Sequence, residues 1–269
     1  MGLTLATAIS IPIHHVGLIQ LFDYSGKDRN DPESIRRRIV ALGVSNTISV
    51  LLTCAVLGVK TVAEAGELFG LQYSGSAAAA VAVGLHTCIL YAPNIIDYIR
   101  TFDWREFKRE MTSLMTFRDT IVAPLGEEIA FRACAASLVS ATLAAHTYNY
   151  QTWSIWLTPW LFALSHLHLI GDDIRRGYSM KEALMRRGFQ VTYSYAFGVY
   201  ATLLFFRTRH LSAPIVCHMI CNSFGLPLIA DLLSHNHSNY RSAMIGLSFM
   251  SLGAFIWFFP SFTDPSLFY

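Results

Sequence analysis

Eight apolar stretches, each close to the length that crosses a lipid bilayer, constrain this chain more than any other feature of its sequence. A helix needs about 20 apolar residues to cross a hydrocarbon core of roughly 30 Å. The stretches cover residues 2–22, 38–59, 76–98, 119–143, 152–170, 189–206, 211–233 and 243–260. Composition agrees, because 53% of the 269 residues are hydrophobic and 14% are charged. We expect an all-α, polytopic membrane bundle of about eight transmembrane helices, in which residues 1–269 form one domain.

Positive charge is distributed unevenly among the connections between these stretches. Sixteen of the 20 Lys and Arg residues lie in the first, third, fifth and seventh connections, whereas the even-numbered ones hold only Lys60, Arg207 and Arg209. Basic residues accumulate on the cytosolic side of membrane proteins, so the odd-numbered connections should face the cytosol. The seventh connection contains a glycosylation sequon at Asn236, which should then stay unmodified.

Three segments depart from the simple pattern of spans and connecting loops. Residues 2–22 are the weakest span, because a proline and two histidines make a re-entrant or interfacial segment nearly as plausible. Residues 101–117 mix aromatic and basic side chains, which is typical of a helix on the cytosolic surface of a membrane. Residues 172–187 form either a second surface segment or a plain solvated loop.

Composition also bears on partners and on disulfides. A net charge of +2 gives no indication of a nucleic-acid partner. All five cysteines lie in apolar stretches, and an odd number there argues against a disulfide framework.

The most informative polar residues lie inside the apolar stretch 119–143. Glu127, Glu128 and Arg132 are costly to bury in a membrane, so such residues usually serve a function. On a helix, Glu128 and Arg132 are four residues apart and can pair, while Glu127 points about 100° away. One carboxylate is therefore neutralised and the other stays available. The alternative, that the three residues only join helices, leaves the unpaired acid without a purpose.

Further polar side chains occur in two later stretches. His166 and His168 should point to opposite sides of their helix, so only one of them is expected to join Glu127. His218 and Asn222 share a helix face, and either can donate a hydrogen bond to a developing oxyanion. His86 has no polar companions and is expected to be structural.

These residue types fit water-mediated hydrolysis of an amide. A buried carboxylate such as Glu127 suits a general base, and with a histidine it could deprotonate water. The sequence contains neither a Gly-x-Ser-x-Gly elbow nor a His-Glu-x-x-His motif. A zinc site with Cys217 or Cys221 stays possible, although no two histidines have zinc-ligand spacing on one helix face.

Three motifs in order on separate stretches resemble those of the type II CAAX prenyl endopeptidases, the Ras-converting enzymes. They are Glu127-Glu128-x-x-x-Arg132, Phe162-x-x-x-His166 and His218-x-x-x-Asn222. The sequence around them, from about residue 29 to residue 267, is similar to the eukaryotic branch of that family.

The resemblance implies a glutamate-type intramembrane protease with a catalytic core at about residues 119–233. Such an enzyme removes the last three residues of prenylated CAAX proteins, such as Ras-like small GTPases, in the endoplasmic reticulum membrane, with its site open to the cytosol. By resemblance, Glu127 is the catalytic carboxylate, His166 helps to activate water, and His218 and Asn222 stabilise the oxyanion. Glu128 and Arg132 support them, and neither a metal nor another cofactor is implied.

Two other functions are compatible with the same residues. A proton-coupled transporter could use Glu127 and the histidines as a relay, but it should show broken helices and paired half-repeats, which the sequence does not indicate. A catalytically inactive scaffold of the same fold is the other possibility, and retention of every motif residue argues against it.

Overall fold

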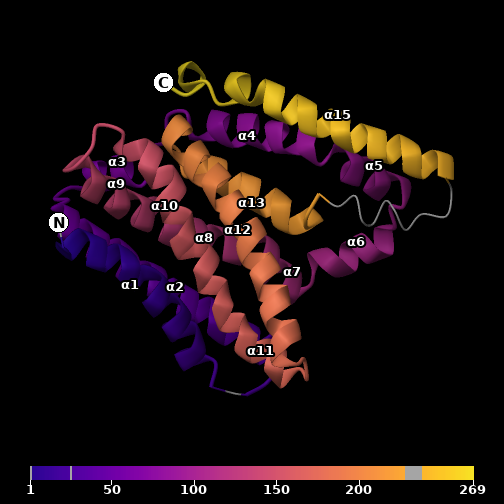
Figure 1. Cartoon of the computed structure of the whole chain (residues 1–269), viewed down its shortest axis with the longest axis horizontal. Helices are drawn as coiled ribbons and strands as arrows, with labels where there is room; N and C mark the ends of the chain where they lie inside the picture. The colour runs from indigo at the N-terminus through magenta and orange to yellow at the C-terminus, as the bar shows by residue number, and fades with distance from the viewer. Residues whose placement is uncertain (1, 25, 228–237) are drawn as a thin grey trace.

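The computed structural model describes residues 2–24, 26–227 and 238–269, and the regular structure within these ranges is helical (Figure 1). Asn236, the expected topology marker, lies outside the described residues.

Along the chain the α-helices are α1 (Gly2–Phe22), α2 (Pro32–Leu57), α3 (Val62–Leu68), α4 (Ser76–Leu90), α5 (Ala92–Arg100), α6 (Trp104–Met111), α7 (Leu114–Phe117), α8 (Ala123–Glu128), α9 (Ser137–Ala144), α10 (Tyr150–Ser165), α11 (Ile170–Arg175), α12 (Met180–Thr208), α13 (Ser212–Phe224) and α15 (Ser238–Phe262). Two π-helical segments, η1 (Arg118–Val122) and η2 (Ile129–Ala136), flank α8, and two 3₁₀ segments, η3 (His166–Leu169) and η4 (Pro265–Leu267), follow α10 and α15.

Helices α1 and α2 lie side by side along one edge of the molecule (Figure 1). Local signals fix the ends of α2: the Asp31 side chain accepts a hydrogen bond from the Glu33 N–H, and Gly58 ends the helix in the left-handed region. Nε2 of His14 lies 2.9 Å from the Ser49 hydroxyl across the pair. His14, one of the two histidines that weakened the first apolar stretch as a span, therefore serves helix packing, and α1 is one continuous helix.

Among the residues that the structure describes, three helices are long and apolar enough to cross a bilayer unaided, namely α1, α2 and residues 240–262 of α15. Helices α4 and α5 together satisfy the same criterion but are bent by 77° at their junction. Pro93, in the first turn of α5, cannot donate the backbone hydrogen bond that would continue α4. An unbroken span over 76–98 was expected, so this bend was missed. The fold is that of an all-α membrane protein, while the number of spans stays a prediction.

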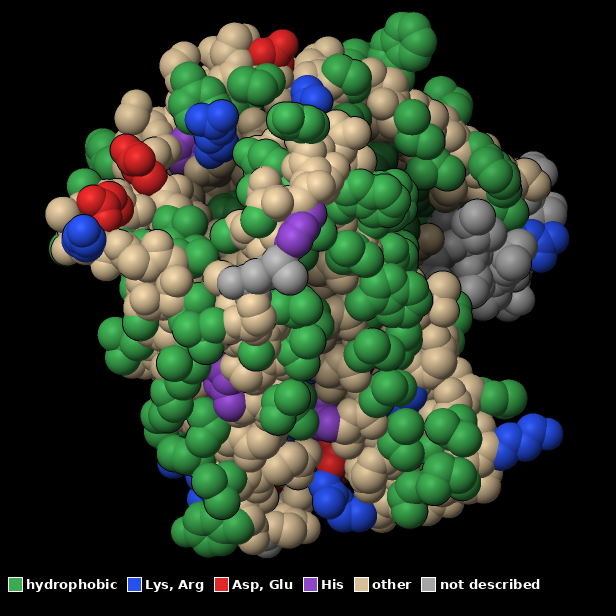
Figure 2. All heavy atoms as spheres, turned by 60° about the vertical axis from the view of Figure 1, so that its left-hand side comes forward, with side chains coloured by type: hydrophobic (Ala, Val, Ile, Leu, Met, Phe, Trp, Pro, Cys, Tyr) green, Lys and Arg blue, Asp and Glu red, His purple; other side chains and the backbone are tan. Residues whose placement is uncertain are grey.

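Hydrophobic side chains cover much of the surface on which α1 lies. Figure 2 shows charged side chains toward the upper and lower ends of this face and a hydrophobic band between them. Helix α1 alone exposes Leu3, Ile9, Ile13 and Leu21. Exposure of such a surface to water would be unfavourable, whereas contact with lipid does not carry this cost.

The segment from α7 to α9 is the central helical column. It runs from Leu114 to Ala144 through η1, α8 and η2 without a non-helical residue, and nearly every residue of η2 is buried. Gly126 allows α2 to approach this column closely, because a Cβ there would lie 2.5 Å from a Leu42 methyl carbon. The column therefore holds Glu127 and Glu128 at a fixed depth between the surrounding helices.

Candidate active site

A cavity of about 760 Å³ extends along the central column and is lined by Glu127, His166, His218 and Asn222. These side chains come from α8, η3 and α13, so the structure brings together the polar residues that the sequence singled out on three separate stretches. Most other lining residues are apolar, among them Leu42 and Phe197. A largely apolar cavity with a few convergent polar groups is the usual form of a small-molecule or peptide site.

Glu128 and Arg132 form the predicted ion pair. Nη1 of Arg132 donates to Oε1 of Glu128 at 2.9 Å, and both side chains are buried. The Arg132 guanidinium also lies over the rings of Phe162 and Phe197, 4.6 and 5.4 Å from their centroids. Ring faces attract cations, so the two phenylalanines compensate part of the hydration that buried Arg132 has lost. Phe162 therefore stabilises the buried Arg132 cation, a role that its position in the motif alone did not indicate.

His218 connects the two glutamates. Its Nδ1 lies 2.7 Å from Oε1 of Glu128, and its Nε2 lies 3.7 Å from Oε2 of Glu127. A carboxylate can only accept, so Nδ1 carries a hydrogen that it donates to Glu128. This bond fixes the tautomer and the orientation of the ring, and it directs Nε2 toward Glu127 and the cavity. Sequence spacing had assigned Glu128 to Arg132 alone.

Glu127 keeps access to the cavity, with a side chain 23% exposed, in contrast to the fully buried Glu128. His166 approaches from η3, and its Nδ1 lies 3.0 Å from the carbonyl oxygen of Phe162. Because a carbonyl oxygen only accepts, Nδ1 of His166 is protonated and Nε2 of the neutral ring keeps its lone pair. The site thus holds a carboxylate and an imidazole that can both accept hydrogen bonds.

Asn222 is oriented by a backbone carbonyl in the central column. Its Nδ2 donates to the Asp119 carbonyl oxygen at 2.8 Å, leaving the second amide hydrogen available. The carbonyl is free for a local reason. In η1 the Ala123 N–H bonds five residues back to Arg118, and the next donor in that series would be Pro124, which has no N–H. Pro124 in the central column therefore leaves free the acceptor that positions Asn222.

His168 also lines the cavity, so the two histidines do not point to opposite sides of a helix as expected, while the expectation that only one of them joins Glu127 stays a prediction. Residues 166–169 form a 3₁₀ turn rather than an α-helical one. Residues two apart are separated by about 120° in such a turn, against about 160° in an α-helix, so both rings can reach one cavity. Nδ1 of His168 lies 2.6 Å from the Ser165 carbonyl oxygen.

Other expectations can be compared directly with the structure. His86 is buried, with Nδ1 3.0 Å from the Tyr200 hydroxyl and Nε2 2.7 Å from the Phe255 carbonyl oxygen, so it joins helices as predicted. All five cysteines are free, and Cys217 and Cys221 line the cavity. Within the ranges that the structure describes, no group of three or more His, Cys, Asp and Glu side chains is arranged to hold a metal ion.

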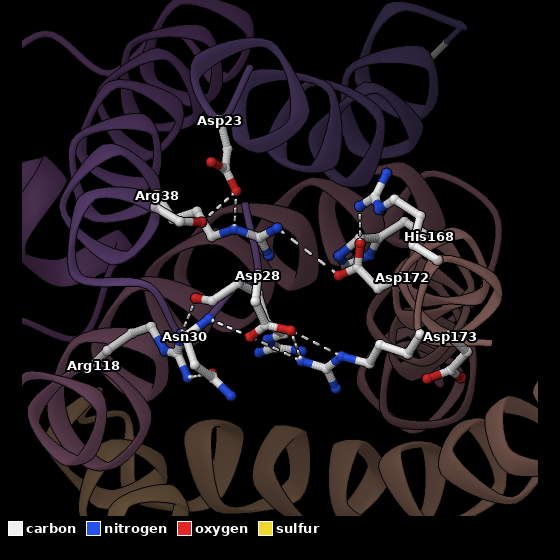
Figure 3. A network of polar contacts seen from close by, with 12 residues as sticks. Asp23, Asp28, Asn30, Arg38, Arg118, His168, Asp172 and Asp173 are labelled. Atoms are coloured by element: carbon white, nitrogen blue, oxygen red, sulfur yellow. Dashed lines mark hydrogen bonds and ion pairs between the residues drawn. The ribbon is translucent and has the colours of Figure 1, made fainter. Parts of the chain in front are cut away.

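A network of charged residues borders the cavity (Figure 3). Arg38 pairs with Asp23 at 2.6 Å and with Asp172 at 3.8 Å, and Arg118 donates to Asn30 at 3.0 Å. Asp172 is buried, so the segment that begins there is more than a solvated loop. The network joins the first, third and fifth connections, whose basic residues the sequence had placed on one side of the membrane.

Several lining residues were missed by sequence reasoning. His15 reaches the cavity from α1, Tyr91 from the bend between α4 and α5, and Arg29, Arg38 and Arg118 from the charged network. The bend also has a function in packing, because the Tyr91 hydroxyl donates to the Gly225 carbonyl oxygen at 2.6 Å. Pro93 was the one local signal that could have indicated it.

This is an apolar helical bundle in which a carboxylate and several imidazoles line one cavity. The class of protein is therefore a membrane protein with a buried acid–base site. Residues 109–224 match the family model "Type II CAAX prenyl endopeptidase Rce1-like". A protein of Caenorhabditis elegans named CAAX prenyl protease 2 is 38% identical over 262 residues, covering 95% of this chain and 96% of the relative.

Relatives with the same name occur in other eukaryotes. The human protein is 27% identical over 278 residues (97% of this chain, 82% of the relative), and that of Arabidopsis thaliana is 30% identical over 227 residues (73% and 70%). No solved structure matches the chain. This chain belongs to the type II CAAX prenyl endopeptidase family, and it is a membrane-bound protease.

Proposed function

We propose that this protease removes the C-terminal tripeptide from farnesylated or geranylgeranylated CAAX proteins, including Ras-like small GTPases. The reaction takes place in the endoplasmic reticulum membrane, with the site open to the cytosol. The names of the relatives support the substrate class. The apolar part of the cavity suits a prenyl chain, which gains free energy on leaving water, and the 16 basic residues of the odd-numbered connections support the orientation.

Glu127 acts as the general base in this mechanism. A water molecule held between its carboxylate and Nε2 of His166 attacks the carbonyl carbon of the scissile amide, and Glu127 takes the proton. The tetrahedral anion then collapses, the C–N bond breaks, and the proton passes from Glu127 to the leaving nitrogen. Glu127 suits this role because it is the carboxylate of the pair that keeps access to the cavity.

His218 and Asn222 stabilise the anion. The hydrogen bond from Nδ1 of His218 to buried Glu128 holds the ring with Nε2 on the cavity side, and in the proposed mechanism the Nε2–H of the imidazolium form donates to the oxyanion. Asn222 supplies its second amide hydrogen, since the first is held by the Asp119 carbonyl. Arg132 balances the charge of Glu128, so both are positioning residues that act through His218. Preorganised donors of this kind commonly supply the largest part of catalysis.

The proposal depends on one observation above all, the convergence of Glu127, His166, His218 and Asn222 on one cavity. Incubation of the purified protein in detergent with a farnesylated CAAX peptide, followed by mass measurement, tests it. The proposal expects loss of three residues from the farnesylated peptide and none from the same peptide without the prenyl group. An unchanged prenylated peptide would contradict it.

A further inference from the structure

Arg29 is a cation on the cavity wall that the proposed mechanism does not use. It follows α1, in the connection that leads to α2, and it is half-buried. Among the residues that the structure describes, none forms a hydrogen bond or ion pair with its guanidinium, although its backbone carbonyl accepts from Nη1 of Arg118 at 2.7 Å.

The neighbouring charges leave Arg29 uncompensated. Arg38 pairs with Asp23 and Asp172, and Arg118 pairs with Asp119 at 2.7 Å. Asp119 and Asp172 attract Arg29 as well, but each already pairs with another guanidinium. Burial, and then repulsion from Arg118 and Arg38, lowers the pKa of Arg29. An anion in the cavity would relieve both effects, and a guanidinium binds a carboxylate through two parallel hydrogen bonds.

Arg29 is also connected to the proposed oxyanion site. Asn222 donates to the Asp119 carbonyl, the Asp119 carboxylate holds Arg118, and Arg118 holds the backbone of Arg29. All four of these residues line the same cavity. A peptide bound with its scissile carbonyl at Asn222 would extend toward its C-terminus for three residues, a reach of at most about 10 Å.

We propose that Arg29 binds the C-terminal carboxylate of the substrate and so sets the number of residues that are removed. The proposal rests on the proposed function and deepens it, because it assigns the recognition of one group of that substrate. Asn222 and Glu127 act on the scissile amide at one end of the tripeptide, and Arg29 holds its free carboxylate at the other. Arg29 is thus a specificity-determining residue.

Two farnesylated peptides of one sequence, ending in a free carboxylate or in a carboxamide, test this assignment. For the wild-type protein, amidation should lower kcat/KM by about 10- to 100-fold, the usual range for one hydrogen-bonded ionic contact. Arg29→Gln should lower kcat/KM for the free acid by a similar factor and should cleave the amide as the wild type does. Amidation should then cost the variant nothing further.

Arg36→Gln is the matched control, because Arg36 is exposed, lies in α2 and does not line the cavity. It should discriminate between the two peptides as the wild type does, and Arg29→Lys should keep part of the discrimination. The assignment is wrong if the wild type cleaves both peptides equally well, if Arg29→Gln keeps the full preference for the free acid, or if that variant loses activity on both peptides equally. A wild-type protein that cleaves neither peptide contradicts the proposed function itself.

Discussion

Nδ1 of His218 lies 2.7 Å from Oε1 of Glu128, although 90 residues separate the two in the sequence. The contact fastens α13 to the central column at the depth of the site. It also gives Glu128 two cationic or donor partners, since Arg132 binds the same oxygen. Glu128 therefore determines where His218 points, and Glu127 stays available for the substrate side of the cavity.

Asn222→Ala should leave the protein folded and slow turnover by about 10²–10³-fold, the usual cost of removing one oxyanion donor. Within the described residues its side chain forms one hydrogen bond, to the Asp119 carbonyl, and Asn222 is exposed, so the thermal midpoint should change little. The check is kcat on a farnesylated peptide together with a melting curve. Ser223→Ala, at the adjacent exposed position, is the control, and near-wild-type turnover in Asn222→Ala would exclude Asn222 from the site.

Chelators should leave cleavage intact, because in this mechanism a carboxylate activates the water. The measurement compares initial rates before and after prolonged treatment of the purified protein with a zinc chelator. Activity that disappears on treatment and returns with stoichiometric zinc would assign the water to a metal and contradict the role of Glu127.

Asp173→Asn should destabilise the protein in a pH-dependent way. The buried Asp173 carboxylate accepts from Arg187 at 2.6 and 2.7 Å, and these bonds hold the pKa of Asp173 below its usual value. A depressed folded-state pKa gives stability that is present above the unfolded pKa of about 3.9 and is lost as pH falls through the folded one. At any pH from 5 to 8 the free energy of unfolding of the variant should be about 3–5 kcal/mol lower than that of the wild type, which is the cost of breaking a buried pair.

Unfolding curves of both proteins across this pH range provide the measurement, and the gap should shrink below about pH 4. Asp28→Asn is the control, because its pair with Arg176 is exposed and should contribute less than about 1 kcal/mol. A gap that stays constant into acid, or no gap at neutral pH, would be inconsistent with this account.

Asn236 should carry no glycan in cells, because the charge distribution places the seventh connection in the cytosol. The measurement is a mobility shift on glycosidase treatment, compared between the wild type and Asn236→Gln. A shift that only the wild type shows would reverse the orientation of this connection.

Local rules predicted part of this site and could not predict the rest. The pair of Glu128 with Arg132 follows from helical spacing, and the shared face of His218 and Asn222 follows from the same geometry. The contact of His218 with Glu128 depends on how two distant helices pack, and spacing along one helix carries no such information. The prediction for His168 assumed a regular α-helix. The 3₁₀ turn at residues 166–169 gives the side chain a different direction.

Backbone irregularities account for most of the other differences. The 77° bend between α4 and α5 was hidden within an apolar stretch of the right length, where Pro93 was the only sign of it. The free carbonyl of Asp119 results from a π-helical turn followed by Pro124, and sequence patterns for such turns are weak. Length and hydrophobicity thus indicate where helices run, but not where they bend or which carbonyls they leave free.

The central claim, that Glu127 is the general base and Glu128 a positioning residue, is tested most directly by comparing Glu127→Gln with Glu128→Gln. Each purified variant is assayed for thermal midpoint and for release of the tripeptide from a farnesylated CAAX peptide. Glu127→Gln should keep the wild-type midpoint and release no tripeptide, because only the proton acceptor is lost. Glu128→Gln should be destabilised by about 3–5 kcal/mol, since it leaves Arg132 buried without its partner, and its remaining activity should be low through misplaced His218. A Glu127→Gln variant that is unstable yet active, beside a Glu128→Gln variant that is stable and inactive, would show that the two roles are reversed.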